Sequence, residues 1–272
     1  MRIGIMHQLR RYASLYGALC RISLVQEMMF KVNFSLWILV ETLWFALQLA
    51  FMGVLYEHTD QIAGWTKWEV IALSGASQFL MQLVSITVMT NLTNLSELIR
   101  TGKLDFFLLL PVNTRFLIST RKFEAGNVFN ALLGLAVLGY ALSRLGVTPS
   151  VLQMAGFALL CAAGLVIHYS LMFLLAIIAF WTVRAQGIVW GYYNLFNIAR
   201  LPDGAIPRGV FKAVFTFVLP MLLVSNVPVK LLTDRLHSPG EGVVLLLLAL
   251  VCLAVSEWVW RRAMRQYTSA SS

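Results

Sequence analysis

Long runs of apolar residues alternate with short polar segments along the chain, and each run approaches the ~20 residues that an α-helix needs to cross a bilayer. Five such runs are clear: Phe34–Tyr56, Val70–Leu92, Phe123–Leu142, Val151–Val183 and Gly242–Trp260. The fourth run exceeds the length of one crossing, so we expect it to tilt or to project beyond the bilayer. The pattern predicts an all-α integral membrane protein.

The region between the fourth and the last run permits two arrangements of one further crossing. Segment 186–201 is semi-polar and contains Asn194 and Asn197, whereas segment 210–229 is more apolar but contains two prolines. In the first arrangement 210–229 crosses the membrane and 186–201 lies in the interface. In the second, 186–201 crosses, and 210–229 dips into the membrane and returns, which requires protein packing around its irregular backbone. Both arrangements give six crossings with both termini on one side.

Residues 1–33 predict an interfacial helix rather than a signal peptide. Arginines interrupt this segment too often for the unbroken apolar centre of a signal peptide. Its apolar residues recur at spacings of three and four, which places them on one helical face. They are Met6, Leu9, Tyr12, Tyr16 and Leu19. With its arginines directed toward lipid headgroups, such a helix lies in the membrane surface. We expect the membrane domain to occupy residues 34–265 and a flexible tail to follow at 266–272.

The longest polar interruption in the first half of the chain, residues 94–122, predicts two short helices joined by a turn. Asn94 followed three residues later by Glu97 is typical of a helix start, because the Asn side chain can accept a hydrogen bond from a free backbone N–H. Gly102 predicts the end of that helix, since glycine adopts the left-handed conformation without steric cost. A second, apolar helix is expected to run until Pro111 interrupts it. This basic and apolar segment suits a structure that another protein binds.

Composition supports a membrane protein. Of the 272 residues, 59% are hydrophobic and only 12% are charged, whereas about 25% of the residues of a soluble protein are charged. The net charge of +9 would suit a nucleic-acid-binding protein, but the basic residues lie between apolar runs, so membrane topology explains them better. In both arrangements most of them share one side with the termini and segment 94–122, which the positive-inside rule assigns to the cytoplasm. Cys20, Cys161 and Cys252 are too scattered for a disulfide framework or a metal site.

Three features occur in order along the chain. The first is Arg100-x-Gly102-x-Leu104-Asp105-x-x-Leu108-x-x-Pro111. The second is Phe180-Trp181-Thr182-Val183, and the third is the series Pro202, Pro207, Pro220 and Pro228. Together they resemble the permease subunits of ABC transporters of the type-2, exporter class, over nearly the whole chain. The nearest subgroup is a bacterial one associated with the export of viologen-like cations.

The resemblance implies a permease subunit in the bacterial inner membrane, with cytoplasmic termini, that forms half of a translocation pathway. A second permease, identical or paralogous, would supply the other half, and two copies of a separate ATPase would bind ATP and Mg. The substrate would be a small or amphiphilic molecule. Residues 1–33 would be the family's elbow helix, and the resemblance favours the arrangement with a re-entrant segment before the last span. The ATPase-coupling residues that it implies are Arg100, Gly102, Lys103, Leu104, Asp105, Phe107, Leu108 and Pro111.

The chain offers little catalytic chemistry of its own. Gly102-Lys103 lacks the upstream glycine and the following Ser or Thr of a phosphate-binding loop, and the four histidines are isolated from one another, so we expect no cofactor, metal or enzymatic activity in this chain. An intramembrane protease would need Ser77 as nucleophile and His168 as base. Gln78 replaces the small residue that usually follows such a serine, and the small residues around Ser77 are more typical of close helix packing.

Glu41 is the one acid deep in the first apolar run. A buried acid in a membrane span suggests a function, here the attraction of a cationic substrate; the alternative is a structural pairing with Gln48 or with a polar group of the second run. Asn194 and Asn197 line the pathway in the second arrangement, or they hydrogen-bond between helices. A stand-alone secondary transporter is the competing hypothesis, but it would need several embedded charges for ion coupling, and Glu41 alone is thin support.

Overall fold

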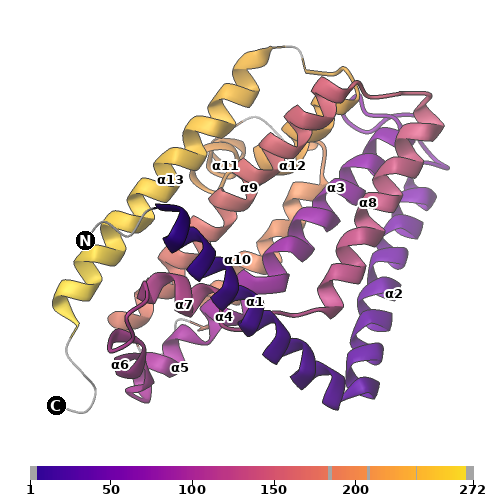
Figure 1. Cartoon of the computed structure of the whole chain (residues 1–272). Helices are drawn as coiled ribbons and strands as arrows, with labels where there is room; N and C mark the ends of the chain where they lie inside the picture. The colour runs from indigo at the N-terminus through magenta and orange to yellow at the C-terminus, as the bar shows by residue number, and fades with distance from the viewer. Residues whose placement is uncertain (1–4, 183–185, 207–208, 237, 268–272) are drawn as a thin grey trace.

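The computed structural model describes residues 5–182, 186–206, 209–236 and 238–267, and within these ranges the chain is helical, with no strand and one isolated β-bridge between Ile62 and Trp65 (Figure 1). The α-helices are α1 (Ile5–Met29), α2 (Lys31–Leu55), α3 (Lys67–Val84), α4 (Thr90–Thr93), α5 (Leu95–Arg100), α6 (Lys103–Leu108), α7 (Thr114–Thr120), α8 (Gly126–Leu145), α9 (Val151–Ile177), α10 (Gln186–Leu195), α11 (Val210–Ala213), α12 (Met221–Leu232) and α13 (Pro239–Gln266). The 3₁₀ segments are η2 (Ile178–Phe180), η3 (Phe196–Arg200) and η4 (Asp203–Ala205), and the π-helical segments are η1 (Ser85–Met89) and η5 (Val214–Val218). Val183, Pro207 and the tail beyond Tyr267 lie outside the described residues.

Five of the described helical stretches are long and apolar enough to cross a membrane. They are Lys31–Leu55, Lys67–Arg100, Gly126–Leu145, Val151–Phe180 and Pro239–Gln266. Each coincides with one of the five apolar runs, although the second and the last extend beyond both predicted ends. A sixth candidate is a pair of helices, Val210–Val218 and Met221–Leu232, that passes the same test only together and is bent by 75°. The predicted all-α membrane class is confirmed, with five to six candidate spans.

Helix α3 lies at the centre of the bundle. In the most apolar 18-residue stretch of Lys67–Arg100, 78% is buried, whereas only 6% of the corresponding stretch of α2 is buried. Its closest neighbour is α8, which runs beside it (Figure 1). A Cβ atom added to Gly134 of α8 would lie 2.8 Å from both the Gly75 carbonyl oxygen and the Phe79 nitrogen. The two helices therefore meet backbone to backbone, and the prediction that small residues around Ser77 serve helix packing is confirmed at Gly75.

The two ends of the bundle differ in what they carry. The lower end in Figure 1 holds α5 and α6, and we call it the α6 end. At the opposite end, Lys230 pairs with Asp203 at 2.7 Å and with Glu241 at 3.0 Å, while Arg235 pairs with Glu69 at 2.5 Å. Because Asp203 and Lys230 meet there, the chain between them, which contains the bent helix pair, leaves this end and returns to it.

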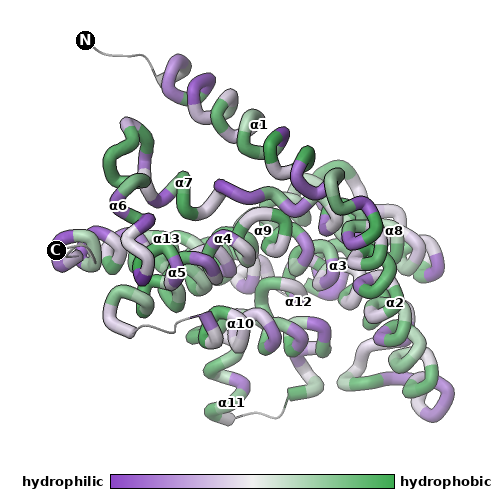
Figure 2. The backbone as a smooth tube through the Cα atoms, turned by 90° about the horizontal axis from the view of Figure 1, so that it is seen from below, coloured by the Kyte–Doolittle hydropathy of each residue, from purple (hydrophilic) through white to green (hydrophobic). Residues whose placement is uncertain are grey.

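Helix α1 packs along one side of the α6 end rather than inside the bundle. Figure 2 shows it running past α7 toward α8 and α2. On its inward face the Tyr12 and Phe116 rings form a T-shaped pair at a centroid distance of 4.9 Å, and Ser23 Oγ accepts a hydrogen bond from the Phe123 N–H at 3.1 Å. Of the residues expected on one face, Tyr12, Tyr16 and Leu19 are partly buried, whereas Leu9 is 66% exposed.

Candidate functional site

A cavity of about 940 Å³ opens between the end of α1, α2, α3, α10 and the connection before α8. Its volume lies at the upper end of the range of pockets that enclose small organic ligands. Aromatic side chains form much of its wall: Phe30, Phe34, Trp37, Trp44, Phe45, Phe123, Trp190 and Tyr193. The cavity is therefore large and apolar enough to accept an organic molecule. Polar residues also line it.

The cavity brings together the three residues that the sequence analysis proposed for a pathway. Glu41 of α2, Asn194 of α10 and Asn197 of η3 all line it. The Glu41 carboxylate accepts a hydrogen bond from Gln82 Nε2 at 3.3 Å. Its partner is thus a polar group of the second span, as one alternative anticipated, and not Gln48 of its own helix.

Further charged groups line the cavity near the α6 end. The residues are Glu27, Glu124 and Lys122. The Glu27 carboxylate accepts the Ala125 N–H at 3.0 Å. Burial raises the pKa of the Glu27 carboxyl, the hydrogen bond from the Ala125 backbone opposes this, and the charge of Glu124 reinforces it. Glu124 itself accepts hydrogen bonds from Thr90 and from Asn127.

Arg200 is a cavity residue that the sequence analysis missed as a site residue. It ends η3, is 8% exposed, and donates from Nη2 to Gln78 Oε1 at 2.7 Å. These two residues lie 122 positions apart, so no local pattern signals that they meet. The cavity wall thus contains both signs of charge.

The loop of residues 99–111, hereafter the 99–111 loop, turns at Gly102. Its φ of +69° confirms the predicted left-handed turn between two short helices. The predicted helix start at Asn94 is confirmed, since α5 begins at the next residue, but the predicted cap hydrogen bond is absent. Asn94 has helical dihedral angles, its Nδ2 donates to the Thr90 carbonyl, and Glu97 pairs with Arg100 at 2.8 Å. The cause is that α4 ends at Thr93, directly before Asn94, so a carbonyl group of that helix is available to the Asn94 side chain.

Helix α6 turns one apolar face inward and one outward. Leu104 is fully buried in the core of the chain, and the Arg121 guanidinium lies 5.6 Å from the centre of the half-buried Phe107 ring. Phe106 is 71% exposed and Leu109 is 81% exposed. Leu104, which the resemblance implied as a contact to a partner, therefore faces its own chain. The same helical period that buries Leu104 and Phe107 could have signalled Phe106 and Leu109 as the outward pair.

The remaining implied coupling residues lie on the surface of the loop. Lys103 and Pro111 are exposed, and Leu108 is 38% exposed. Arg100 is exposed and engaged by Glu97. None of these side chains is buried, so all remain accessible in the described part of the chain.

Both ends of the described chain hold the 99–111 loop in place. Arg11 Nη2 donates to the Pro111 carbonyl oxygen at 2.9 Å, and Tyr267 Oη donates to Asp105 Oδ1 at 3.0 Å. Burial raises the pKa of Tyr267 to about 12, and the hydrogen bond and charge of Asp105 add to this, so the phenol stays a donor at neutral pH. The loop is thus tethered at two points while its outward apolar face stays open.

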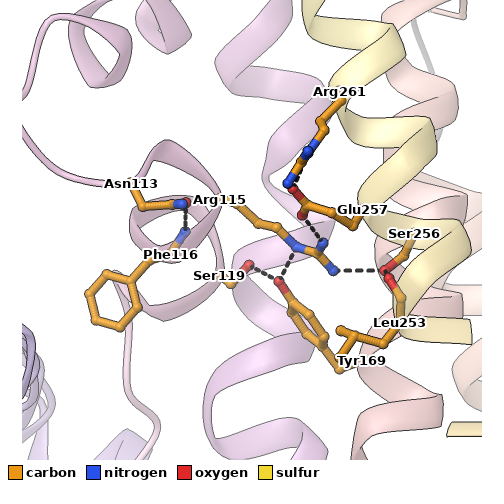
Figure 3. A network of polar contacts seen from close by, with 9 residues as sticks. All are labelled: Asn113, Arg115, Phe116, Ser119, Tyr169, Leu253, Ser256, Glu257 and Arg261. Carbon is orange, nitrogen blue, oxygen red and sulfur yellow. Dashed lines mark hydrogen bonds and ion pairs between the residues drawn. The ribbon is translucent and has the colours of Figure 1, made fainter. Parts of the chain in front are cut away.

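Arg115 joins α7, the helix after the loop, to two long helices (Figure 3). It is 8% exposed, and its three guanidinium nitrogens all donate. Nε donates to Tyr169 Oη of α9 at 2.9 Å, Nη1 to Glu257 Oε2 of α13 at 2.7 Å, and Nη2 to Ser256 Oγ at 2.8 Å. A displacement of α7 therefore pulls on α9 and α13 directly.

The arrangement that a protease would need is not assembled among the described residues. Ser77 Oγ donates to the Ala199 carbonyl at 3.1 Å, and His168 Nδ1 lies 2.8 Å from Tyr192 Oη. The two side chains have separate partners, both within the bundle. In the described part of the chain, no group of three or more His, Cys, Asp or Glu residues is placed to hold a metal ion.

Several membrane-length helices around a partly polar cavity are the architecture of a multi-pass membrane transport protein. The sequence profile of the ABC-2 family transporter proteins matches residues 42–271. The chain therefore belongs to the ABC-2 transporter family and is a membrane permease of an ABC transporter, a family whose permeases associate with an ABC ATPase. No curated protein matches the chain.

Proposed function

We propose that the chain is the permease subunit of an ATP-driven exporter in which two permeases, identical or paralogous, share one pathway. ATP and Mg bind to two copies of a partner ATPase. One observation carries the proposal: a family permease combines a cavity of about 940 Å³ with an exposed apolar loop between its second and third candidate spans. The likeness to viologen exporters rests on the sequence features alone, and the mixed charges of the cavity do not extend it.

The proposed topology places the α6 end and both termini in the cytoplasm of a bacterial cell. The distribution of Lys and Arg supports this orientation. The pairing of Asp203 with Lys230 supports a re-entrant 210–229 segment, with 186–201 as the fifth of six spans. The position of α1 beside α7 supports an elbow helix at the cytoplasmic surface.

Cysteine labelling in intact cells tests this topology. An impermeant thiol reagent is expected to label cysteines placed at Thr59 and Gly209 and to leave one at Lys103 unlabelled. Labelling at Lys103 would reverse the orientation. Protection at Gly209 would favour 210–229 as the crossing segment instead.

The proposed ATPase contact is the outward face of the 99–111 loop. Buried apolar anchors carry most of the binding energy of such interfaces, and rim charges carry little. Phe106 and Leu109 supply the exposed apolar surface, and Gly102, Lys103 and Leu108 complete the accessible turn. Motion of the bound ATPase then reaches α9 and α13 through Arg115 and changes the access of the cavity.

Co-purification of the partner ATPase with the permease tests this contact. Full burial of a leucine side chain is worth about 1.5–3 kcal/mol, so Leu109→Asp is expected to weaken ATPase binding by at least tenfold. Leu152→Asp is the matched control, because Leu152 is 82% exposed and is the second residue of α9, at the opposite end. Lys103→Ala is expected to have little effect. Equal ATPase recovery with Leu109→Asp and Leu152→Asp would remove the loop from the interface.

A further inference from the structure

Three basic side chains in the described chain share the same low exposure of 8%, and one of them differs from the others in its partners. Arg115 pairs with Glu257, and Lys230 pairs with Asp203 and Glu241. Arg200 pairs with no carboxylate of the described residues. A buried charge is costly unless it is neutralised, and Arg200 has only the more distant charge of Glu41 in place of an ion pair.

The hydrogen bonds of Arg200 are also incomplete. Nη2 donates to Gln78 Oε1 at 2.7 Å and contacts Met81 Sδ at 3.5 Å. Nε and Nη1 are buried and have no hydrogen-bond partner among the described residues. Nε and Nη1 lie on opposite edges of the guanidinium, and each forms a parallel pair of donors with Nη2. The second N–H of Nη2 together with either of them matches the two oxygens of a carboxylate, sulfonate or phosphate.

Arg200 stands where two cavities adjoin. It lines the cavity of about 940 Å³ and a second cavity of about 310 Å³, and Trp44 and Asn197 also line both. The Phe45 ring centre lies 5.9 Å from the guanidinium carbon. A group bound at Arg200 therefore lies beside the aromatic side chains of Trp44 and Phe45.

We propose that Arg200 binds the oxyanion of an amphiphilic molecule whose apolar part lies against Trp44 and Phe45. The site is chemically fit for a carboxylate, sulfonate or phosphate that is attached to an apolar body. Identifying this molecule as the transported substrate rests on the proposed export function; the binding itself does not. A molecule bound in the cavity would therefore carry an anionic group, whereas Glu41 by itself suggested only a cationic substrate.

Binding of two dyes by the purified permease in nanodiscs of neutral phosphatidylcholine tests the proposal. 1-Anilinonaphthalene-8-sulfonate carries the oxyanion, and N-phenyl-1-naphthylamine has the same rings without it. Energy transfer from the cavity tryptophans to each dye reports binding, with empty nanodiscs as the partition blank. Arg200→Gln is expected to raise the dissociation constant of the sulfonate dye by about tenfold or more, because hydrogen bonds to charged groups are strong. The affinity for the neutral dye is expected to stay unchanged.

Two further variants keep the result decisive. Arg200→Lys, which retains the charge without the fork of donors, is expected to bind the sulfonate dye with intermediate affinity. Arg144→Gln, at an arginine that stacks on Trp68 away from the cavity, is expected to behave as wild type. If Arg200→Gln changes neither dye, or changes both equally, Arg200 is a water-solvated structural group and the proposal is wrong.

Changing the lipid composition shows whether the oxyanion at Arg200 belongs to a lipid headgroup or to a soluble amphiphile. Phosphatidylglycerol added to the nanodiscs is expected to raise the dissociation constant of the sulfonate dye more for wild type than for Arg200→Gln if lipid phosphate occupies the site. Equal dependence in both proteins assigns the site to a soluble amphiphile. Because no ATPase is present, failure of the export proposal leaves this measurement intact.

Discussion

Replacing Gly134 with alanine is expected to force α3 and α8 apart. The new Cβ would lie 2.8 Å from two backbone atoms, Gly75 O and Phe79 N, and an ordinary contact begins at about 3.4 Å. Backbone atoms within two long helices cannot rotate away as a side chain can, so the helices must separate. Overpacking of this kind typically costs about 1–3 kcal/mol.

Gly139 provides the matched control in the same helix, because a Cβ there meets nothing within 4 Å. Both substitutions gain the helix propensity of alanine, worth about 1 kcal/mol, so the difference between the two variants isolates the cost of the contact. A shift of about 2–4 °C per kcal/mol predicts that Gly134→Ala unfolds about 2–12 °C below Gly139→Ala. The assay is thermal unfolding in detergent, followed by tryptophan fluorescence. Equal midpoints, or a higher one for Gly134→Ala, would refute the close α3–α8 contact.

Three further predictions concern the loop, its link to the spans and the cavity. Gly102→Ala places a side chain at a φ of +69° and is expected to cost more than about 1 kcal/mol; an unchanged unfolding midpoint would contradict the left-handed turn. Arg115→Met is expected to abolish substrate-stimulated ATP hydrolysis while the ATPase still co-purifies, whereas Arg261→Gln, at a side chain that is 72% exposed, has little effect; normal stimulation in Arg115→Met would exclude its coupling role. Glu41→Gln keeps a polar partner for Gln82 and is expected to impair transport but not assembly; loss of the protein from the membrane would indicate a structural role.

The sequence determined those features that depend on single residues or on one contiguous segment. Each of the five apolar runs gave a membrane-length helix, because about 20 apolar residues suffice to cross the hydrocarbon and no distant contact is needed to specify them. The turn at Gly102 was equally predictable, since the preference for positive φ belongs to glycine itself. The helix start at Asn94 was predicted, but its cap hydrogen bond was not formed, because the Asn94 side chain binds a carbonyl group of the helix that ends directly before it.

Tertiary structure decided everything that depends on which distant residues meet. Leu104 and Leu109 are both apolar residues of one short segment, yet the core of the chain buries the first and leaves the second open. The sequence permitted two arrangements after the fourth span, and the contact of Asp203 with Lys230 supports the re-entrant one that we propose. No local pattern indicated a role for Arg200, because its environment depends on distant residues. Its hydrogen-bond partner Gln78 lies 122 positions away, and two of its other nitrogens have no partner among the described residues.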